Sequence, residues 1–385
     1  MRNTRRSPNA IALLITLGIP AVAQTPTSLR FSIQSATFHG TAYSPLAQKQ
    51  TFTATERIGI DNTGLAAAVS QPWVTIDFNC VSAGSTSATL CSVGVASAFL
   101  GPGTYTATVT VTGASNGPQT IAIQYIADPP APGVPTFGDV MNAADYFSEP
   151  LITGEIVSIF GVNLGPVRAV AFDGSSGGVP TSLAGTRVLF NSVAAPLLYV
   201  QDHQINAVVP TLTASPVQVQ VEFQGVLSSV LTLFSANQPY SPGIFTLDYS
   251  GTGQGVILNQ DGTLNTPTNP AGRGSVISIY ATGLGQTNPA IADGKIVTAL
   301  APVTADVRVY FSTDPYIPTF ASPSISYAGL APGFVGVYRV DATVPPDAPT
   351  GLLPLRLRLP GGFCFGTGFF CSAGTGSNIV NVSLR

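Results

Sequence analysis

The stretch GEIVSIFGVNLGP, residues 154–166, decides the fold because it occurs again as GSVISIYATGLGQ, residues 274–286. In each copy a run of β-branched and aromatic residues ends at a glycine-containing turn, which predicts a strand followed by a sharp reversal. Two more blocks repeat in the same order, with YVQDHQINAVVP matching GVYRVDATVP, and SSVLTLF matching SNIVNVSL. The copies lie roughly 120 to 150 residues apart, too far for a solenoid unit, so they predict two tandem, diverged domains.

Strand patterns dominate the rest of the chain. Residues alternate between apolar and polar in TYTATVTVTG (104–113), PVQVQVEFQG (216–225) and LPLRLRLPG (353–361), and no long helical period appears. A Pro-rich spacer, ADPPAPGVP (127–135), separates a first domain from the repeats. The 385 residues exceed what one hydrophobic core usually organises. The pattern therefore predicts an all-β chain of three tandem immunoglobulin-like β-sandwiches with Greek-key connections.

The first 23 residues, MRNTRRSPNAIALLITLGIPAVA, have the features of a secretory signal peptide. Arg2, Arg5 and Arg6 precede an apolar run that glycine and proline interrupt, and the run ends in the small residues of Ala21–Ala23. No later segment reaches the roughly 18 consecutive apolar residues that a membrane-spanning helix needs. We expect an exported chain, extracellular, at the cell surface or in the periplasm, with no transmembrane segment after cleavage.

The predicted domain bounds follow from the leader, the spacer and the repeats. They are 1–23 for the signal peptide, 24–130 for the first sandwich, 131–238 for the second and 239–385 for the third.

Charge is scarce, at 9% of residues against about 25% in ordinary soluble proteins. Without the leader and its three arginines the chain has 12 basic and 18 acidic residues, a net charge of −6 that is spread thinly. This balance predicts neither a nucleic-acid partner nor a polybasic membrane contact. Solubility must then come from neutral polar side chains.

Four cysteines in an exported chain predict two disulfides, for which three pairings exist. Local pairing of Cys80 with Cys91 and of Cys364 with Cys371 keeps each bridge within one domain. In the chain-entropy description each short loop would contribute about 2.5 to 3 kcal/mol. A zinc site is the competing interpretation, but the spacings are not those of CxxC pairs and the chain has only two histidines.

The residues also carry family resemblances. The runs VMNAADYFSEPLITGEIVSIFGVNLGP, SLAGTRVLFNSVAAPLLYVQDHQINAVVP and YAGLAPGFVGVYRVDATVP resemble the uncharacterised C-terminal domain of Solibacter-type secreted proteins, over about residues 138 to 385. The GEIVSIFGVNLG pattern also resembles IPT/TIG immunoglobulin-like domains. QPWVTI (71–76) and LGPGTYTATVTVTG (100–113) are similar to BACON-type β-sandwiches, a resemblance that implies carbohydrate or mucin binding. The C-terminal resemblance implies a fold and a compartment, but no reaction.

A catalytic triad is the first candidate site. GSSGG (174–178) satisfies G-x-S-x-G with Ser176 at its centre, and Asp202 and His203 follow in the order of α/β-hydrolases. A nucleophile elbow needs a strand before the serine and a helix after it, whereas VPTSLAG follows here. Adjacent Asp202 and His203 are expected on opposite faces of a strand. We therefore interpret the segment as a solvated loop and predict no catalytic residues.

Metal and phosphate sites are not predicted either. His39 and His203 are the only imidazoles, the acids are scattered, and no calcium-loop motif occurs. NQDGTLN (259–265) is interpreted as a hairpin that turns at Asp261 and Gly262. The glycine-rich GTGQG and GLGQ segments are interpreted as turns, because no helix follows them. We expect no metal and no cofactor.

Aromatic residues provide the candidate binding sites. Trp73 has a flat face that suits a sugar ring, although a single Trp in a β-sandwich is more often part of the core. Near the C-terminus, GGFCFGTGFFCSAG places Phe363, Phe365, Phe369 and Phe370 around the two cysteines of a predicted hairpin. These phenylalanines are expected to cap the last domain, to pack on the preceding one, or to form an exposed docking surface.

These features predict a non-catalytic recognition or adhesion module. We expect it to bind polysaccharide or a cell-envelope protein through loops and edge strands, since neutral glycans require stacking and neutral hydrogen bonds rather than charge. Two alternatives stay open: a passive structural spacer or matrix protein, and a hydrolase whose site is assembled from scattered residues.

Overall fold

A computed structural model of the chain describes residues 28–43, 48–57, 66–71, 73–77, 89–95, 100–112, 116–147, 151–174, 177–212, 215–233, 239–313, 319–360, 364–365, 370–371 and 375–385. The predicted signal peptide, Cys80, Ser176, Phe363 and Phe369 lie outside these residues.

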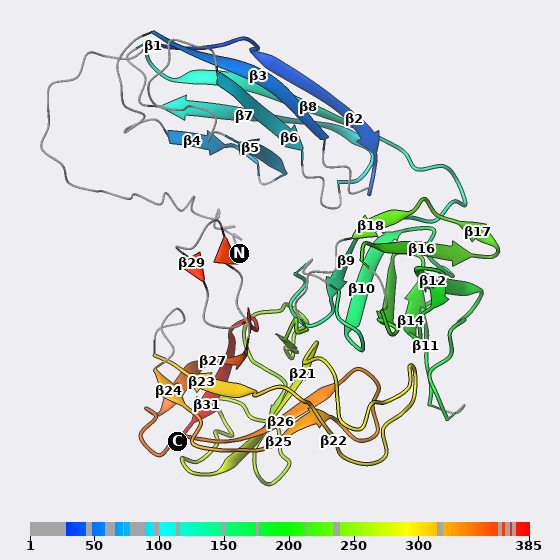
Figure 1. The fold of residues 1–385 in the computed structure, drawn as a ribbon, viewed down its shortest axis with the longest axis vertical. Helices are drawn as coiled ribbons and strands as arrows, with labels where there is room; N and C mark the ends of the chain where they lie inside the picture. Colours follow the sequence, from blue (N-terminus) through cyan, green and yellow to red (C-terminus); the bar gives the residue numbers. More distant parts are fainter. Residues whose placement is uncertain are drawn as a thin grey trace, which may run out of the picture. The chain divides into compact units, whose positions relative to one another are not determined.

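Every regular element among the described residues is a β-strand (Figure 1), which confirms the predicted all-β class. No helix long and apolar enough to cross a bilayer occurs in this part of the chain. The chain divides into two compact units: residues 1–36, 49–94 and 106–123 form one, and residues 37–48, 95–105 and 124–385 form the other.

Strands up to residue 128 form two four-stranded sheets. One has the order β1 (Ser28–Phe31), β3 (Gln48–Arg57), β6 (Thr89–Val95), β5 (Val74–Asp77); the other has β2 (Ser35–Thr41), β8 (Gln119–Asp128), β7 (Gly103–Thr112), β4 (Ala66–Val69). The alternation predicted over 104–113 becomes β7, in which Ala107, Val109 and Val111 are buried.

The next two sheets enclose one core. The first has the order β11 (Val170–Ala171), β14 (Leu197–Gln201), β15 (Gln204–Val208), β10 (Ile156–Val162), β9 (Thr136–Asn142). The second has β13 (Val193–Ala194), β12 (Thr186–Phe190), β16 (Val217–Phe223), β17 (Val226–Leu227), and β18 (Leu231–Leu233) also pairs with β16. Side chains from both sheets, such as Val157, Ile205, Phe190 and Val219, belong to one buried cluster, so this is a β-sandwich.

The last sandwich is built in the same way. One sheet has the order β19 (Gly243–Ile244), β21 (Val276–Thr282), β26 (Tyr338–Thr343), β25 (Ile325–Leu330), β22 (Ala301–Pro302), and β20 (Ile257–Leu258) also pairs with β21. The facing sheet has β24 (Phe320–Ala321), β23 (Arg308–Phe311), β27 (Gly351–Leu359), β30 (Thr375–Gly376), and β31 (Val380–Leu384) also pairs with β27. Ile279, Val340, Leu355 and Val382 lie in their common core.

The repeated blocks form equivalent strands. In the first copy β10 pairs antiparallel with β15, and in the second β21 pairs antiparallel with β26. The third block supplies β18 and β31, which pair with β16 and β27 in the facing sheets. The sequence repeat therefore corresponds to a repeated strand pairing, while the exact domain bounds stay a prediction.

The predicted turns occur where expected. Asn259 and Thr263 close a hairpin around Asp261 and Gly262, whose φ is 79°. In the GLGQ turn, Gly283 has a φ of 74°, and its carbonyl oxygen accepts a hydrogen bond from Ser241 N at 2.9 Å. Gly283 lies so close to Ser241 that an added Cβ would overlap the Ser241 carbonyl oxygen. This close approach, and not the turn alone, requires glycine.

We predict that Gly283→Ala destabilises the protein by roughly 3 to 5 kcal/mol, the sum of left-handed strain and steric overlap. Gly274→Ala is the matched control, because Gly274 has the same φ of 74° but no atom within 4 Å of an added Cβ. It should cost only about 1 to 2 kcal/mol. Urea unfolding followed by circular dichroism measures both, and equal losses would contradict the steric explanation.

Candidate functional site

A cleft of about 1000 Å³ lies between the outer faces of the β10 sheet and the β21 sheet, within the unit that holds residues 124–385. The alternation of side chains along the strands determines which residues line this cleft. In β10, Val157 and Ile159 enter the core of their own sandwich, so Ile156 and Ser158 face the other way. Both are nevertheless buried, because the other sandwich covers this face. In β21, Tyr280 faces the cleft in the same manner.

Aromatic side chains from both sandwiches line the cleft. They are Tyr146 and Tyr199 from the first sandwich, and Phe245, Tyr249, Tyr280 and Phe334 from the second. Tyr249 is 81% exposed and Phe334 is 50% exposed, so large ring faces are accessible at the rim. The Tyr146 ring lies 6.1 Å from that of Phe160. Burial, and secondarily the nearby Tyr249, raises the pKa of Tyr146, which keeps its hydroxyl neutral.

Neutral polar groups complete the surface. Ser158 Oγ donates a hydrogen bond to Asn206 Oδ1 at 3.2 Å, and Gln204 Nε2 donates to the same oxygen at 2.9 Å. Both bonds use the oxygen of Asn206, so neither occupies its Nδ2 donors. The described residues that line the cleft include no carboxylate, ammonium, guanidinium or imidazole group.

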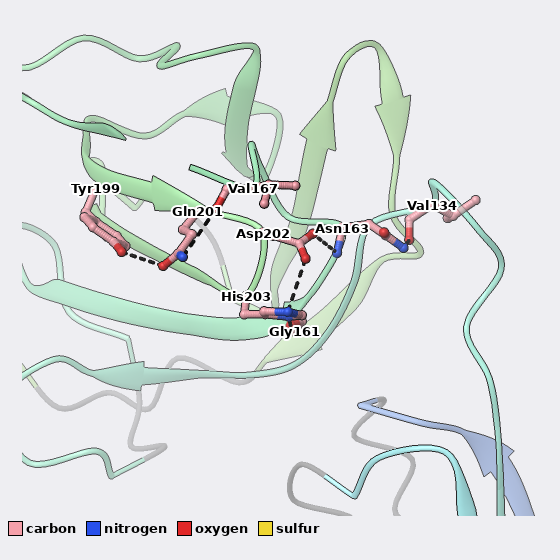
Figure 2. Close-up of polar contacts among 8 residues, drawn as sticks. All are labelled: Val134, Gly161, Asn163, Val167, Tyr199, Gln201, Asp202 and His203. Atoms are coloured by element: carbon pink, nitrogen blue, oxygen red, sulfur yellow. Dashed lines mark hydrogen bonds and ion pairs between the residues drawn. The ribbon is translucent and has the colours of Figure 1, made fainter. Parts of the chain in front are cut away.

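Tyr199 is fixed by a chain of hydrogen bonds along the end of β14. Its hydroxyl donates to Gln201 Oε1 at 2.6 Å, and Gln201 Nε2 in turn reaches Val167 O at 3.5 Å (Figure 2). The ring at the cleft wall is therefore positioned before any ligand arrives.

Buried hydrogen bonds hold the two walls together. Ile156 N donates to Thr282 Oγ1 at 2.8 Å, and Thr282 Oγ1 donates to Gly336 O at 2.8 Å. Asn142 Nδ2 donates to Ser241 O at 2.9 Å. At another part of the same junction, Thr211 donates through N and Oγ1 to the carboxylate of Asp293, each at 3.0 Å. These bonds fix how the two sandwiches meet and therefore the width of the cleft.

Glu155 lies buried at the same junction. Its Oε2 accepts a hydrogen bond from Ile152 N at 3.0 Å. Burial raises the pKa of this carboxyl from 4.5 to about 8, since the charged form loses its hydration and Asp145 adds repulsion, against smaller opposing hydrogen bonds. Burial, followed by the charge of Glu155, also raises the pKa of Tyr338, whose hydroxyl donates to Gly285 O at 2.7 Å. At neutral pH the side chains of Glu155 and Tyr338 are therefore both uncharged.

The structure corrects one reason given against a catalytic triad. Asp202 and His203 do not point to opposite faces of a strand, because they form the turn between β14 and β15 and their side chains meet, with His203 Nε2 3.2 Å from Asp202 Oδ2 (Figure 2). The pair also binds backbone: His203 Nδ1 donates to Gly161 O at 3.0 Å, and Asp202 Oδ1 accepts from Asn163 N at 3.0 Å. These contacts tie the turn to the end of β10, which is a structural role.

The candidate binding residues predicted from the sequence are Trp73 and those of the Phe-rich hairpin. Trp73 is 8% exposed, which agrees with the core interpretation and leaves little ring surface for a sugar. β28 (Cys364–Phe365) pairs with β29 (Phe370–Cys371), so Cys364 lies opposite Cys371 and Phe365 opposite Phe370, the register that the predicted hairpin requires. Cys91 lies buried on β6. Both disulfides and the role of the phenylalanines stay predictions.

The cleft itself was not predicted from the sequence. Its aromatic residues come from segments far apart in the chain, and Tyr146 and Tyr249 lie in turns with no strand pattern. One signal was present in the sequence: both tyrosines stand beside small and polar residues that favour turns. In the structure both have positive φ, 61° and 57°.

Comparison with known proteins identifies one domain. The family model described as IPT/TIG domain matches residues 146–237, so this part of the chain carries an immunoglobulin-like IPT/TIG domain, as the GEIVSIFGVNLG block predicted. No curated protein matches the sequence.

Solved structures resemble the chain only loosely. The protein SGBP-B of the Bacteroides ovatus mixed-linkage glucan utilization locus, in complex with a mixed-linkage heptasaccharide, is 10% identical with a TM-score of 0.28 over 90% of this chain and 65% of that one. An endo-fucoidan hydrolase of glycoside hydrolase family 107 is 11% identical with a TM-score of 0.19 over 94% and 44%. Protocadherin gamma B7 extracellular cadherin domains 1–4 are 11% identical with a TM-score of 0.20 over 93% and 76%. The chain thus spans less than two thirds of the first two, and similarity this low transfers no function.

We predict that stability falls as pH rises from about 4.5 to about 8. In this window the unfolded chain ionises Glu155 while the folded protein keeps the proton, so the unfolded state binds fewer protons. The loss should total roughly 3 to 5 kcal/mol. Glu155→Gln, a neutral isostere, should remove this contribution.

Urea unfolding at pH 5.0 and pH 8.5 measures the effect. Glu222→Gln is the control, because Glu222 lies at the surface in a 3.0 Å ion pair with Arg187. An unchanged pH slope in Glu155→Gln would show that this carboxyl is not the source.

Proposed function

We propose that this chain is a non-catalytic recognition module, exported to the cell surface or the surrounding medium, that binds a neutral polysaccharide in the cleft between its two tandem sandwiches. One observation carries the proposal: a cleft walled by six aromatic rings and neutral amide and hydroxyl groups, without a charged group among its described lining residues.

The chemistry of this surface suits sugar rings. The apolar C–H faces of a pyranose pack against flat aromatic faces, and its hydroxyls need neutral donors and acceptors at the edges. Asn206, Gln204 and Ser158 supply such groups on the wall opposite Tyr280. A neutral glycan has no charge that a charged lining could attract, so an uncharged lining does not weaken its binding.

Tyr249 is held ready for stacking. It lies at φ 57°, a conformation that needs support from its surroundings. Tyr249 N donates to Thr246 O at 3.2 Å, and Gly251 N donates to Thr246 Oγ1 at 3.0 Å. The neighbouring Ser250 donates from N and Oγ to Asp248 Oδ1 at 3.2 and 2.7 Å. A loop whose backbone is fixed in advance loses little entropy when its exposed ring meets a ligand.

The volume of the cleft favours an oligomeric ligand. At about 1000 Å³ it lies at the upper end of the range of small-molecule pockets. Its open rim, where Tyr249 and Phe334 are exposed, lets a chain of sugar rings extend beyond the cleft.

We further propose a BACON-like sandwich over 24–130 and immunoglobulin/IPT-like sandwiches over 131–238 and 239–385, which resemble the Solibacter-type domain from about residue 138 onward. We propose the disulfides Cys80–Cys91 and Cys364–Cys371 as well. The Phe-rich hairpin is then a cap or a docking surface for a cell-envelope protein. A passive spacer would retain no glycan. A hydrolase would turn over chromogenic esters or glycosides and lose that activity in Ser176→Ala or His203→Ala.

We predict that Tyr249→Ala weakens binding of the best neutral glycan about tenfold, the equivalent of roughly 1.4 kcal/mol, because it removes the exposed stacking face. Affinity electrophoresis against a panel of soluble neutral polysaccharides identifies the glycan, and isothermal titration calorimetry measures the change.

Two controls make the result specific. Tyr249→Phe keeps the ring and should bind within about threefold of the wild type, a change below 1 kcal/mol. Leu352→Ala removes a side chain that is 54% exposed on the facing sheet and should bind normally. The proposal is wrong if no neutral glycan is retained, or if Tyr249→Ala and Leu352→Ala bind alike.

A further inference from the structure

A second polar surface lies on the outer face of the β23–β27 pair, in the last sandwich. In β27, Leu355 and Leu357 enter the core, so Arg356 and Arg358 face outward. Arg308 and Tyr310 face outward from β23. Three of the chain's 15 basic residues therefore gather on two adjacent strands of a sequence that is otherwise poor in charge.

The register brings like charges together. Arg308 lies directly opposite Arg358, and Tyr310 lies directly opposite Arg356. Like charges in a cross-strand pair repel one another and destabilise the sheet. The charge of Arg358, together with the larger effect of burial, also lowers the pKa of Arg356. Such an arrangement is unfavourable for folding unless an anion balances it.

Asp306 balances only part of this charge. Its Oδ2 accepts two hydrogen bonds from Arg308, from Nε at 3.0 Å and from Nη2 at 2.9 Å. The Arg358 guanidinium instead lies over the Tyr310 ring, 5.8 Å from its centroid. The aromatic contact positions Arg358 but supplies no negative charge. Among the described groups that line the pocket, two guanidiniums therefore stand against one carboxylate.

These groups line a pocket. A hollow of about 230 Å³ is bounded by Asp306, Arg308, Tyr310, Arg358, Leu359 and Pro360. Two guanidiniums stand at its wall, and the planar fork of donors of a guanidinium matches a carboxylate or a sulfate. In Arg308, Nε and Nη2 already donate to Asp306, so the fork of Arg358 is the main site for an added anion. Pro360 is exposed and adds an apolar side, against which the C–H face of a sugar ring can lie.

We propose that this arginine pocket binds an anionic substituent of a polysaccharide, a carboxylate or a sulfate ester, at a site separate from the neutral cleft. The anion relieves the repulsion between Arg308 and Arg358, and the adjoining sugar ring packs on the apolar side. The site gives the chain affinity for acidic glycans in addition to neutral ones.

Affinity electrophoresis tests the proposal, with the full chain migrating through gels that contain polygalacturonate, dextran sulfate or uncharged dextran. The wild type should be retarded by at least one of the two anionic polymers. Arg308→Gln/Arg358→Gln should lose this retardation, with an apparent affinity at least fivefold weaker. Inorganic sulfate added to the gel should compete with the polymer, since both present the same chemistry.

Three controls separate the pocket from other effects. Arg168→Gln/Arg273→Gln removes the same net charge from exposed positions elsewhere and should migrate like the wild type. Arg308→Lys/Arg358→Lys keeps the charge without the forked donors and should bind with intermediate affinity. Tyr249→Ala should leave retardation by anionic polymers unchanged. The proposals for the neutral cleft and for this pocket are therefore tested independently of each other. The proposal is overturned if neither anionic polymer retards the wild type, or if both double Gln variants lose retardation equally.

Discussion

The side chain of Thr282 is the contact on which the rest of the arrangement depends. This side chain is fully buried, accepts a hydrogen bond from Ile156 N and donates one to Gly336 O. It therefore joins the start of β10 in the first copy of the repeat to the end of β21 in the second copy. A hydroxyl that both donates and accepts can satisfy two buried backbone groups at once, whereas an apolar residue of the same size would leave both unpaired. The junction therefore has one favourable geometry and not a range of them.

That geometry turns a duplicated fold into a cleft. Each sandwich alone would present the outer face of its β10 or β21 sheet to water. Held together by Thr282 and Asn142, the two faces enclose aromatic rings from both copies in one cleft. Because Glu155 is kept protonated by burial near neutral pH, this carboxyl adds no charge to the junction beside the cleft.

The fold could be predicted from the sequence because local patterns determine it. The alternation in residues 216–225 and 353–361 became β16 and β27, and the repeated blocks became equivalent strand pairs. The cleft could not be predicted from the sequence, because contacts between the sandwiches bring its aromatic residues together. No regular sequence spacing relates Tyr146, Tyr199, Tyr249 and Phe334. Asp202 and His203 were misjudged for a local reason: a two-residue turn lets neighbouring side chains meet, whereas a strand would separate them.

The last sandwich carries both proposed surfaces on different sheets. Tyr280 projects from the β21 sheet into the cleft, whereas Arg308 and Arg358 project from the β23–β27 pair, and the core that contains Ile279 and Leu357 lies between them. Two ligands on opposite faces of one core do not compete for space, and a neutral lining does not attract the anions that an arginine pair requires. If both surfaces bind as proposed, the chain can therefore hold an uncharged segment and an acidic segment of glycan at the same time.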